Sequence, residues 1–122
     1  MTLTKGLKPL RPSLRDSNRY IAFEIMSKKK ISSFDTVRDT IETAFRNLHG
    51  DLLMAQAGLM VVKNTWNEGT QRGVIKVERR FSDHVRAALV LIAEIKGQNV
   101  LIHSLISSGM INRAKKHMAQ GA

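Results

Sequence analysis

The sequence contains no cysteine, which excludes disulfide bonds, thiolate metal sites and cysteine nucleophiles. Its longest apolar run, Val85 to Ile95, is interrupted by Arg86 and Glu94 and is too short to span a bilayer. The basic N-terminus lacks the apolar segment of a secretory signal peptide. We therefore expect a cytoplasmic protein with no membrane partner.

Proline and glycine are also scarce. Two prolines and eight glycines among 122 residues, with 43% hydrophobic residues, indicate one folded domain rather than a low-complexity or disordered chain. Both prolines fall within residues 1–18, where no helical or strand period is found. The predicted organisation is a basic arm at 1–18, a folded α/β domain at 19–109 and a basic tail at 110–122 with the pattern of a short helix.

Acidic residues are half as numerous as basic ones, and the resulting net charge of +10 is segregated. Residues 1–30 carry eight Lys/Arg against two Asp/Glu, and residues 72–122 carry nine against three. The intervening residues 31–71 carry three Lys/Arg against five Asp/Glu. Because concentrated like charge destabilises a folded chain, this pattern favours a polyanionic partner. Nucleic acid is the partner class that the sequence indicates first.

The spacing of apolar residues predicts the elements of the fold. Ile21, Phe23 and Ile25 alternate, as in a strand with one face on the core. The segment 34–48 carries its apolar residues on one helical stripe, between a Ser32 or Ser33 cap and Gly50. The full set of expected elements is a strand at 19–26, this helix, a short helix at 51–58, a hairpin of strands at 59–66 and 71–80, a helix from Ser82 or Asp83 to Gly97, and a last strand at 99–106.

Apart from the short helix, the order is strand, helix, strand, strand, helix, strand. This order is typical of the split βαβ class of α+β folds, called ferredoxin-like or RRM-like. We therefore predict a four-stranded antiparallel sheet with helices packed on one face. Because this arrangement hosts unrelated functions, it does not by itself identify one.

No catalytic or metal-binding motif is found. The four histidines lack the i, i+4 spacing of a helical zinc site, and no carboxylate motif accompanies them. GxGxxG, P-loop and GxSxG motifs are also absent. We expect no catalytic residue, no bound metal and no cofactor on the protein.

The run from Arg72 to Val77 is similar to the third-strand motif of an RRM, but Val and Ile hold its aromatic positions. A base-stacking platform is therefore not expected, and RNA would be bound through phosphate and shape. If Ile75 and Val77 face the core, Val74 lies on the open face of the sheet. With Trp66 and the apolar last strand, this predicts an apolar surface that another protein covers. Trp66 and Val74 are the candidate protein-interface residues.

Three segments resemble the archaeal and eukaryotic ribonuclease P protein component 2 family. Leu14-Arg15-Asp16 leading into residues 19–23 is similar to that family, and so is the run 72–79 followed by a helix. The strand Val100-Leu101-Ile102-His103 leading to Ser108-Gly109-Met110-Ile111 is similar to a family strand that leads to a Ser-Gly-Thr-Ile element, with Met110 in place of the threonine. The matching segments span about residues 14–112 in the same order.

The resemblance implies a protein subunit of ribonuclease P, the RNA-based endonuclease that removes the 5′ leader of precursor tRNA. It implies that the RNA is the catalyst, with magnesium at the RNA active site. The implied partners are the ribonuclease P RNA and a TIM-barrel-like protein subunit. Precursor tRNA is an indirect partner, and the resemblance leaves open whether the protein also forms a homodimer. From the charge pattern and the resemblance together, the predicted RNA-binding residues are Arg11, Arg15, Arg19, Lys28, Lys29, Lys30, Lys76, Arg79, Arg80, Arg113, Lys115 and Lys116.

Two other functions remain open on the sequence. A general RNA-binding protein, such as a ribosomal or tRNA-associated factor, shares the charge pattern and needs no TIM-barrel-like partner. A small-molecule regulatory domain of ferredoxin-like fold would suit an apolar sheet face. Its weakness is that no metabolite site requires a strong excess of positive charge at both ends of the chain.

Overall fold

The computed structural model describes residues 17–119, with side chains described as far as residue 116. Most of the predicted arm at 1–18 therefore lies outside the described residues. The elements, in chain order, are β1 (Asn18–Ser27), α2 (Phe34–His49), α3 (Asp51–Ala57), β2 (Met60–Val61), η1 (Lys63–Thr65), β3 (Arg72–Glu78), η2 (Arg79–Phe81), α4 (Ser82–Leu91), β4 (Glu94–Ile95), β5 (Gln98–Ser108) and α5 (Ile111–Ala119), where η marks a 3-10 helix.

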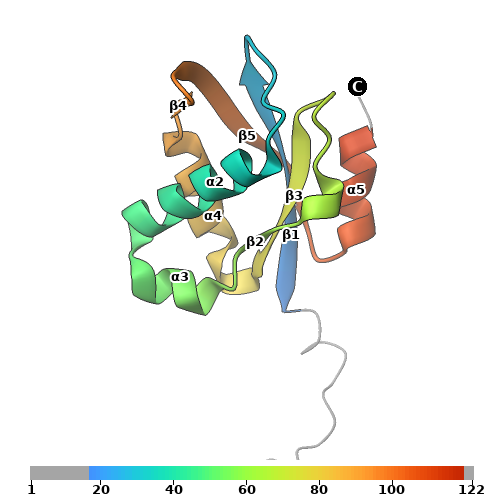
Figure 1. The fold of residues 1–122 in the computed structure, drawn as a ribbon. Coiled ribbons are helices and arrows are strands. Elements are labelled where there is room, and N and C mark those ends of the chain that lie inside the picture. The colour runs from blue at the N-terminus through green and yellow to red at the C-terminus, as the bar shows by residue number, and fades with distance from the viewer. Residues whose placement is uncertain (1–16, 120–122) are drawn as a thin grey trace, which may run out of the picture.

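The strands form one antiparallel sheet in the order β2-β3-β1-β5-β4, with β1 at its centre (Figure 1). The antiparallel α+β fold is as predicted. The predicted count of four strands is wrong, because β4 adds a fifth strand at the edge beyond β5.

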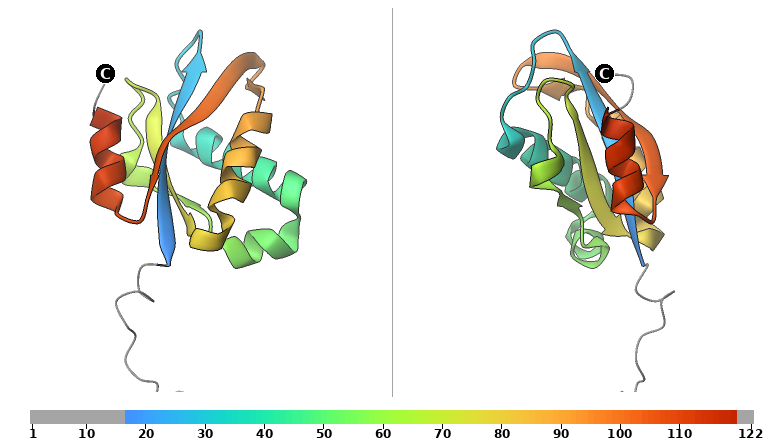
Figure 2. Two further views of the ribbon diagram at one scale, coloured as in Figure 1. Left: turned by 180° about the vertical axis from the view of Figure 1, so that it is seen from behind. Right: turned by 90° about the vertical axis from the view of Figure 1, so that its right-hand side faces the viewer.

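Helices cover both faces of the sheet, in contrast to the single covered face that we predicted. α2 and α4 pack on one face, whereas α5 lies across the other (Figure 2). The alternation of β1 explains this: Ile21, Phe23 and Ile25 point into the main core under α2 and α4. Ala22 points to the opposite face, where it joins Val74 and Ala114 in a second, smaller cluster. A sheet with apolar residues on both faces needs cover on both.

The predicted strand at 19–26 and the helix from Ser33 to Gly50 are confirmed by β1 and α2. The Ser33 hydroxyl accepts a hydrogen bond from the backbone N–H of Thr36 at 3.2 Å, as expected of an N-cap. The short helix at 51–58 is present as α3.

The first strand of the predicted hairpin is shorter than expected. Its strand β2 contains only Met60 and Val61, after which the chain enters η1 and returns to β3 through a single bridge between Asn67 and Arg72. Thr65 explains the change, because its hydroxyl accepts from the Val74 N–H at 3.0 Å and donates to the Val62 carbonyl at 2.7 Å. A side chain thereby takes over hydrogen bonding that a longer strand would provide.

The helix predicted to end at Gly97 ends at Leu91. Ile92 has extended backbone angles, and Glu94–Ile95 turn back through Lys96 and Gly97 to pair with β5. The Ser82 or Asp83 cap is also wrong, because η2 runs directly into α4 and leaves no extended residue before the helix. Ile92 and Ile95 are buried all the same, so their spacing fitted a helix as well as a turn into a strand.

Candidate nucleic-acid interface

The start of β1 and the end of β3 bring three predicted RNA-binding arginines to one end of the sheet. Asn18 pairs with Glu78, so Arg19 on β1 lies beside the segment that carries Arg79 and Arg80. The Arg79 backbone N–H donates to the Ser17 carbonyl at 2.6 Å and ties η2 to the start of the sheet. Arg79 and Arg80 are both exposed. We call Arg19, Arg79 and Arg80 the arginine end.

The arginine end is only partly neutralised. The Glu78 carboxylate accepts from the Arg80 backbone N–H at 2.8 Å and from its Nε at 3.1 Å. The backbone hydrogen bond from Arg80 is the main reason that the pKa of Glu78 lies below its ordinary value. Arg79 has no ion-pair partner among residues 17–116, whose side chains are described. Glu78 therefore offsets only part of the positive charge of Arg79 and Arg80.

Gly109 leaves room for the guanidinium of Arg19. A Cβ built on Gly109 would come within 3.1 Å of Arg19 Nη1. The Ser-Gly element on which the family resemblance rests thus packs directly against the arginine end. Any larger residue at this position would have to move the guanidinium.

The three lysines that follow β1 lie at the opposite end of the sheet. Lys28, Lys29 and Lys30 are exposed, and the Lys30 ammonium donates to the Gly69 carbonyl of the β2–β3 connection. We call these three residues the lysine end. The 10 residues of β1 separate it from the arginine end by roughly 30 Å. Six of the predicted residues therefore form two separate basic surfaces.

Lys96 belongs with the lysine end and was missed from the sequence. It lies in the turn between β4 and β5 and lines the same hollow as Lys28 and Lys29. The interpretation of residues 82–97 as one helix concealed it. The adjacent Gly97, read as a helix stop, was the signal for a two-residue hairpin turn.

The remaining predicted RNA-binding residues are distributed over α5 and β3 or lie beyond the described part. Arg113, Lys115 and Lys116 are exposed on α5, whereas Ala114 between them is fully buried against the sheet. Lys76 is half-buried on β3. Arg11 and Arg15 fall outside the described residues. RNA contact by any of these side chains stays a prediction.

The placement of Val74 on an open sheet face is wrong. Val74 is fully buried, because α5 covers it and packs Ala114 beside it. Trp66 is half-buried, and its ring stacks on Phe23 with 6.2 Å between centroids. Gly73 permits this packing, since a Cβ there would come within 2.9 Å of the Phe23 ring. The chain's own helix supplies much of the cover that we expected from another protein.

Met110 occupies the position where a helix cap is expected. Its carbonyl accepts from the backbone N–H groups of Arg113 and Ala114 at 3.2 and 3.4 Å, but its side chain has no oxygen to accept a further one. Since the family segment that this run resembles carries threonine here, its hydroxyl would act as an N-cap of α5.

Met110→Thr is therefore expected to raise the free energy of unfolding by about 1 kcal/mol. Urea denaturation followed by circular dichroism measures the change. Met110→Ala, which removes the side chain without adding an acceptor, is the control and should gain nothing. Equal stabilities of the two variants would contradict the capping role.

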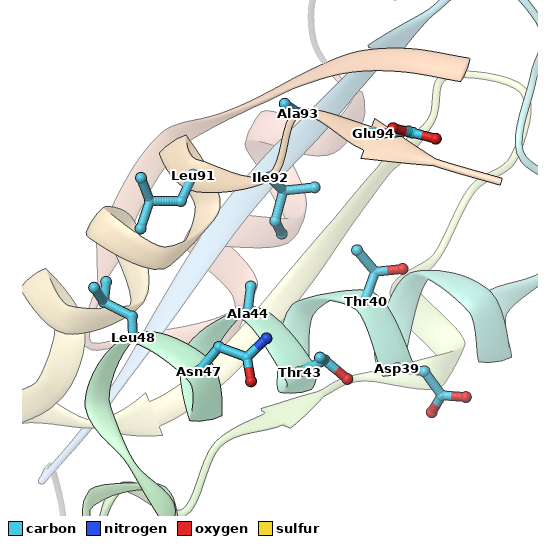
Figure 3. A pocket seen from close by; sticks show the side chains of 10 residues that line it. All are labelled: Asp39, Thr40, Thr43, Ala44, Asn47, Leu48, Leu91, Ile92, Ala93 and Glu94. Atoms are coloured by element: carbon cyan, nitrogen blue, oxygen red, sulfur yellow. The ribbon is translucent and has the colours of Figure 1, made fainter. Parts of the chain in front are cut away.

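A groove separates α2 from the C-terminal end of α4 and differs in character from both basic ends. Its volume is about 590 Å³, and Figure 3 shows Leu48 and Leu91 at one end of it and Asp39 and Glu94 at the other. No lysine or arginine lines it. Phosphate groups would be repelled by its carboxylates, so it suits a protein better than RNA.

The described residues hold no helix long and apolar enough to cross a bilayer. Among the same residues, no three His, Asp or Glu side chains gather in a group that could hold a metal ion.

Comparison with known proteins gives a consistent relationship. The sequence profile of the Rpp14/Pop5 family matches residues 19–119. Ribonuclease P protein component 2 of Pyrococcus abyssi is 38% identical over 110 residues, which cover 90% of this chain and 91% of that protein. The protein of the same name from Methanosarcina mazei is 31% identical, over 93% and 94% of the two chains.

A chain in the cryo-EM structure of yeast ribonuclease MRP has a similar fold, with a TM-score of 0.60 at 12% identity over 84% of this chain and 86% of that chain. Family profile and relatives extend over nearly all of the described residues, including both ends of the sheet and α5. The chain therefore belongs to the Rpp14/Pop5 family.

Proposed function

We propose that this protein is a subunit of ribonuclease P and supports the RNA of that enzyme in removing the 5′ leader of precursor tRNA. The observation that carries the proposal is the pair of exposed basic surfaces at opposite ends of β1, in a chain whose relatives are named as ribonuclease P protein components. The protein contributes binding, and the RNA contributes the catalysis.

The proposed mechanism is electrostatic. Exposed lysine and arginine side chains neutralise phosphates that approach one another closely when the RNA folds. Without the protein, that repulsion must be screened by magnesium or other cations. The protein therefore lowers the magnesium concentration at which the RNA reaches its active fold, while the catalytic magnesium stays on the RNA.

We assign the protein partner, a TIM-barrel-like subunit, to the groove between α2 and α4. The groove's leucines offer apolar contact area, and its two carboxylates disfavour RNA there. Precursor tRNA is met indirectly, through the RNA subunit, and a homodimer is the alternative occupant of the groove. We take the fold to be a split βαβ arrangement to which β4 adds an edge strand. The proposed location is cytoplasmic.

RNA binding measured over a range of salt concentrations tests this function against its alternatives. Two basic surfaces roughly 30 Å apart fit an RNA that presents phosphates at that spacing, so we expect tighter binding to an archaeal ribonuclease P RNA than to an unrelated folded RNA of equal length. Equal affinity for the two would favour a general RNA-binding protein. Absence of RNA binding would favour a small-molecule regulatory domain.

A further inference from the structure

We propose that Lys28, Lys29 and Lys96 together form one site for the phosphates of an RNA backbone. This inference rests on the proposed function and adds to it a residue and a location. The three lysines line a hollow of about 440 Å³ between the loop after β1 and the β4–β5 turn. Gly97, Gln98 and Asn99 complete its lining, so no carboxylate competes for the ammonium groups there.

The two loops that carry the lysines are fixed to each other by a pair of reciprocal hydrogen bonds. The Lys29 backbone N–H donates to Gln98 Oε1 at 3.1 Å, and Gln98 Nε2 donates back to the Lys29 carbonyl at 3.0 Å. The backbone that carries Lys28, Lys29 and Lys96 therefore keeps its arrangement without a ligand. A preorganised site loses less conformational entropy when it binds.

A further set of hydrogen bonds connects the lysine loop to the core. The Ser27 hydroxyl donates to the Lys29 carbonyl at 2.7 Å, and Gln71 Nε2 donates to the Ser27 oxygen at 2.9 Å and to the Ile25 carbonyl at 3.0 Å. Gln71 itself is buried. A polar network thus positions the backbone beneath the lysines before any ligand binds.

The backbone of Lys96 is a second, independent indication that its charge is used. Lys96 has φ +50° and Gly97 has φ +80°, the signs required at both positions of a two-residue type I′ turn. Asn, Asp or Gly are strongly preferred at the first position, because other side chains are strained there. Turn geometry therefore does not explain a lysine at this position, whereas a requirement for positive charge beside Lys28 and Lys29 does.

The chemistry of the site fits a phosphodiester backbone rather than base edges. Ammonium groups act as compact point charges on flexible stems and bind phosphate without reading sequence. Contacts of this kind weaken steeply as salt rises, because each one releases condensed counterions. The slope of log affinity against log salt therefore measures how many lysines contact phosphate.

Lys96→Asn separates the two roles of residue 96, because it creates the preferred Asn-Gly turn while it removes the charge. We expect the melting temperature of the protein to rise by a few degrees. We also expect its affinity for a ribonuclease P RNA to fall roughly fivefold near 150 mM salt, and the slope of log affinity against log salt to shrink by about one. Lys28→Gln with Lys29→Gln should reduce that slope by about two.

Lys63→Asn is the matched control, since Lys63 is an exposed lysine in η1 that does not line the hollow. It should leave the slope unchanged. Unchanged affinity and slope in Lys96→Asn would overturn the site. If RNA binding then still falls on replacement of Arg79 and Arg80, the proposed function stands without this site. If the unmodified protein does not bind the RNA, both are overturned.

Discussion

Replacement of Ala114 by aspartate is expected to detach α5 from the sheet and to lower the free energy of unfolding by about 3 kcal/mol or more. Ala114 is fully buried and shares its cluster with Ala22 and Val74, none of which can pair with a carboxylate. The neighbouring cations, Arg113 and Lys115, are exposed and lie about 100° around the helix on either side of Ala114. An unpaired charge in this position is poorly solvated, so either the helix leaves or the domain unfolds.

Urea denaturation measures the loss, and native-state hydrogen exchange distinguishes the two outcomes. Detachment alone removes protection from the amides of α5, whereas β1 and β3 keep theirs. Asn112→Asp is the control, because it adds the same charge at an exposed position in the first turn of the same helix. If Ala114→Asp were as stable as Asn112→Asp, α5 would not pack on the sheet as described.

Removal of the guanidinium groups of Arg79 and Arg80 is expected to have the largest functional effect. Both side chains are exposed at the arginine end, and Glu78 pairs with only one of them. Two phosphate contacts are worth about tenfold or more in RNA affinity near physiological salt. The Arg79→Ala, Arg80→Ala variant should therefore require more magnesium for half-maximal cleavage by the reconstituted enzyme, while its circular dichroism spectrum stays unchanged.

The chain offers a control of identical net charge. Arg46→Ala with Arg86→Ala also removes two arginines, from α2 and α4, where each pairs with an exposed aspartate. Exposed pairs of this kind contribute little to stability, so the control protein should stay folded. Its magnesium requirement should match that of the unmodified protein. A shift as large as that of the Arg79 and Arg80 variant would mean that only net charge matters.

The central strand and the helices with a clear apolar period could be predicted from the sequence. Alternation around Phe23 placed β1, and the Ser33 cap with the Gly50 stop placed α2 to within a residue or two. The length of α4 could not be predicted, because Ile92 and Ile95 keep helical spacing although the backbone has already turned into β4. The apolar spacing shows which side chains are buried. It does not show whether the backbone that carries them is hydrogen-bonded as a helix or as a strand.

The candidate site was predicted in its parts but not in its arrangement. Charge segregation identified exposed cations such as Lys29 and Arg79, because a run of like charge is seldom buried. Their positions at opposite ends of β1 depend on the register of the sheet. The amino-acid composition contains no information about that register. Val74 was misplaced because Ala114, which packs against it, lies 40 positions further along the chain in a separate helix.

The most direct test of the account is precursor-tRNA cleavage by a cognate ribonuclease P RNA at limiting magnesium, with and without this protein and the TIM-barrel-like partner that we propose. We predict that the RNA alone is nearly inactive under these conditions and that cleavage at the mature 5′ end appears when the protein pair is added. If this protein bound the RNA with full affinity and cleavage still did not appear with the pair, the central claim would be contradicted.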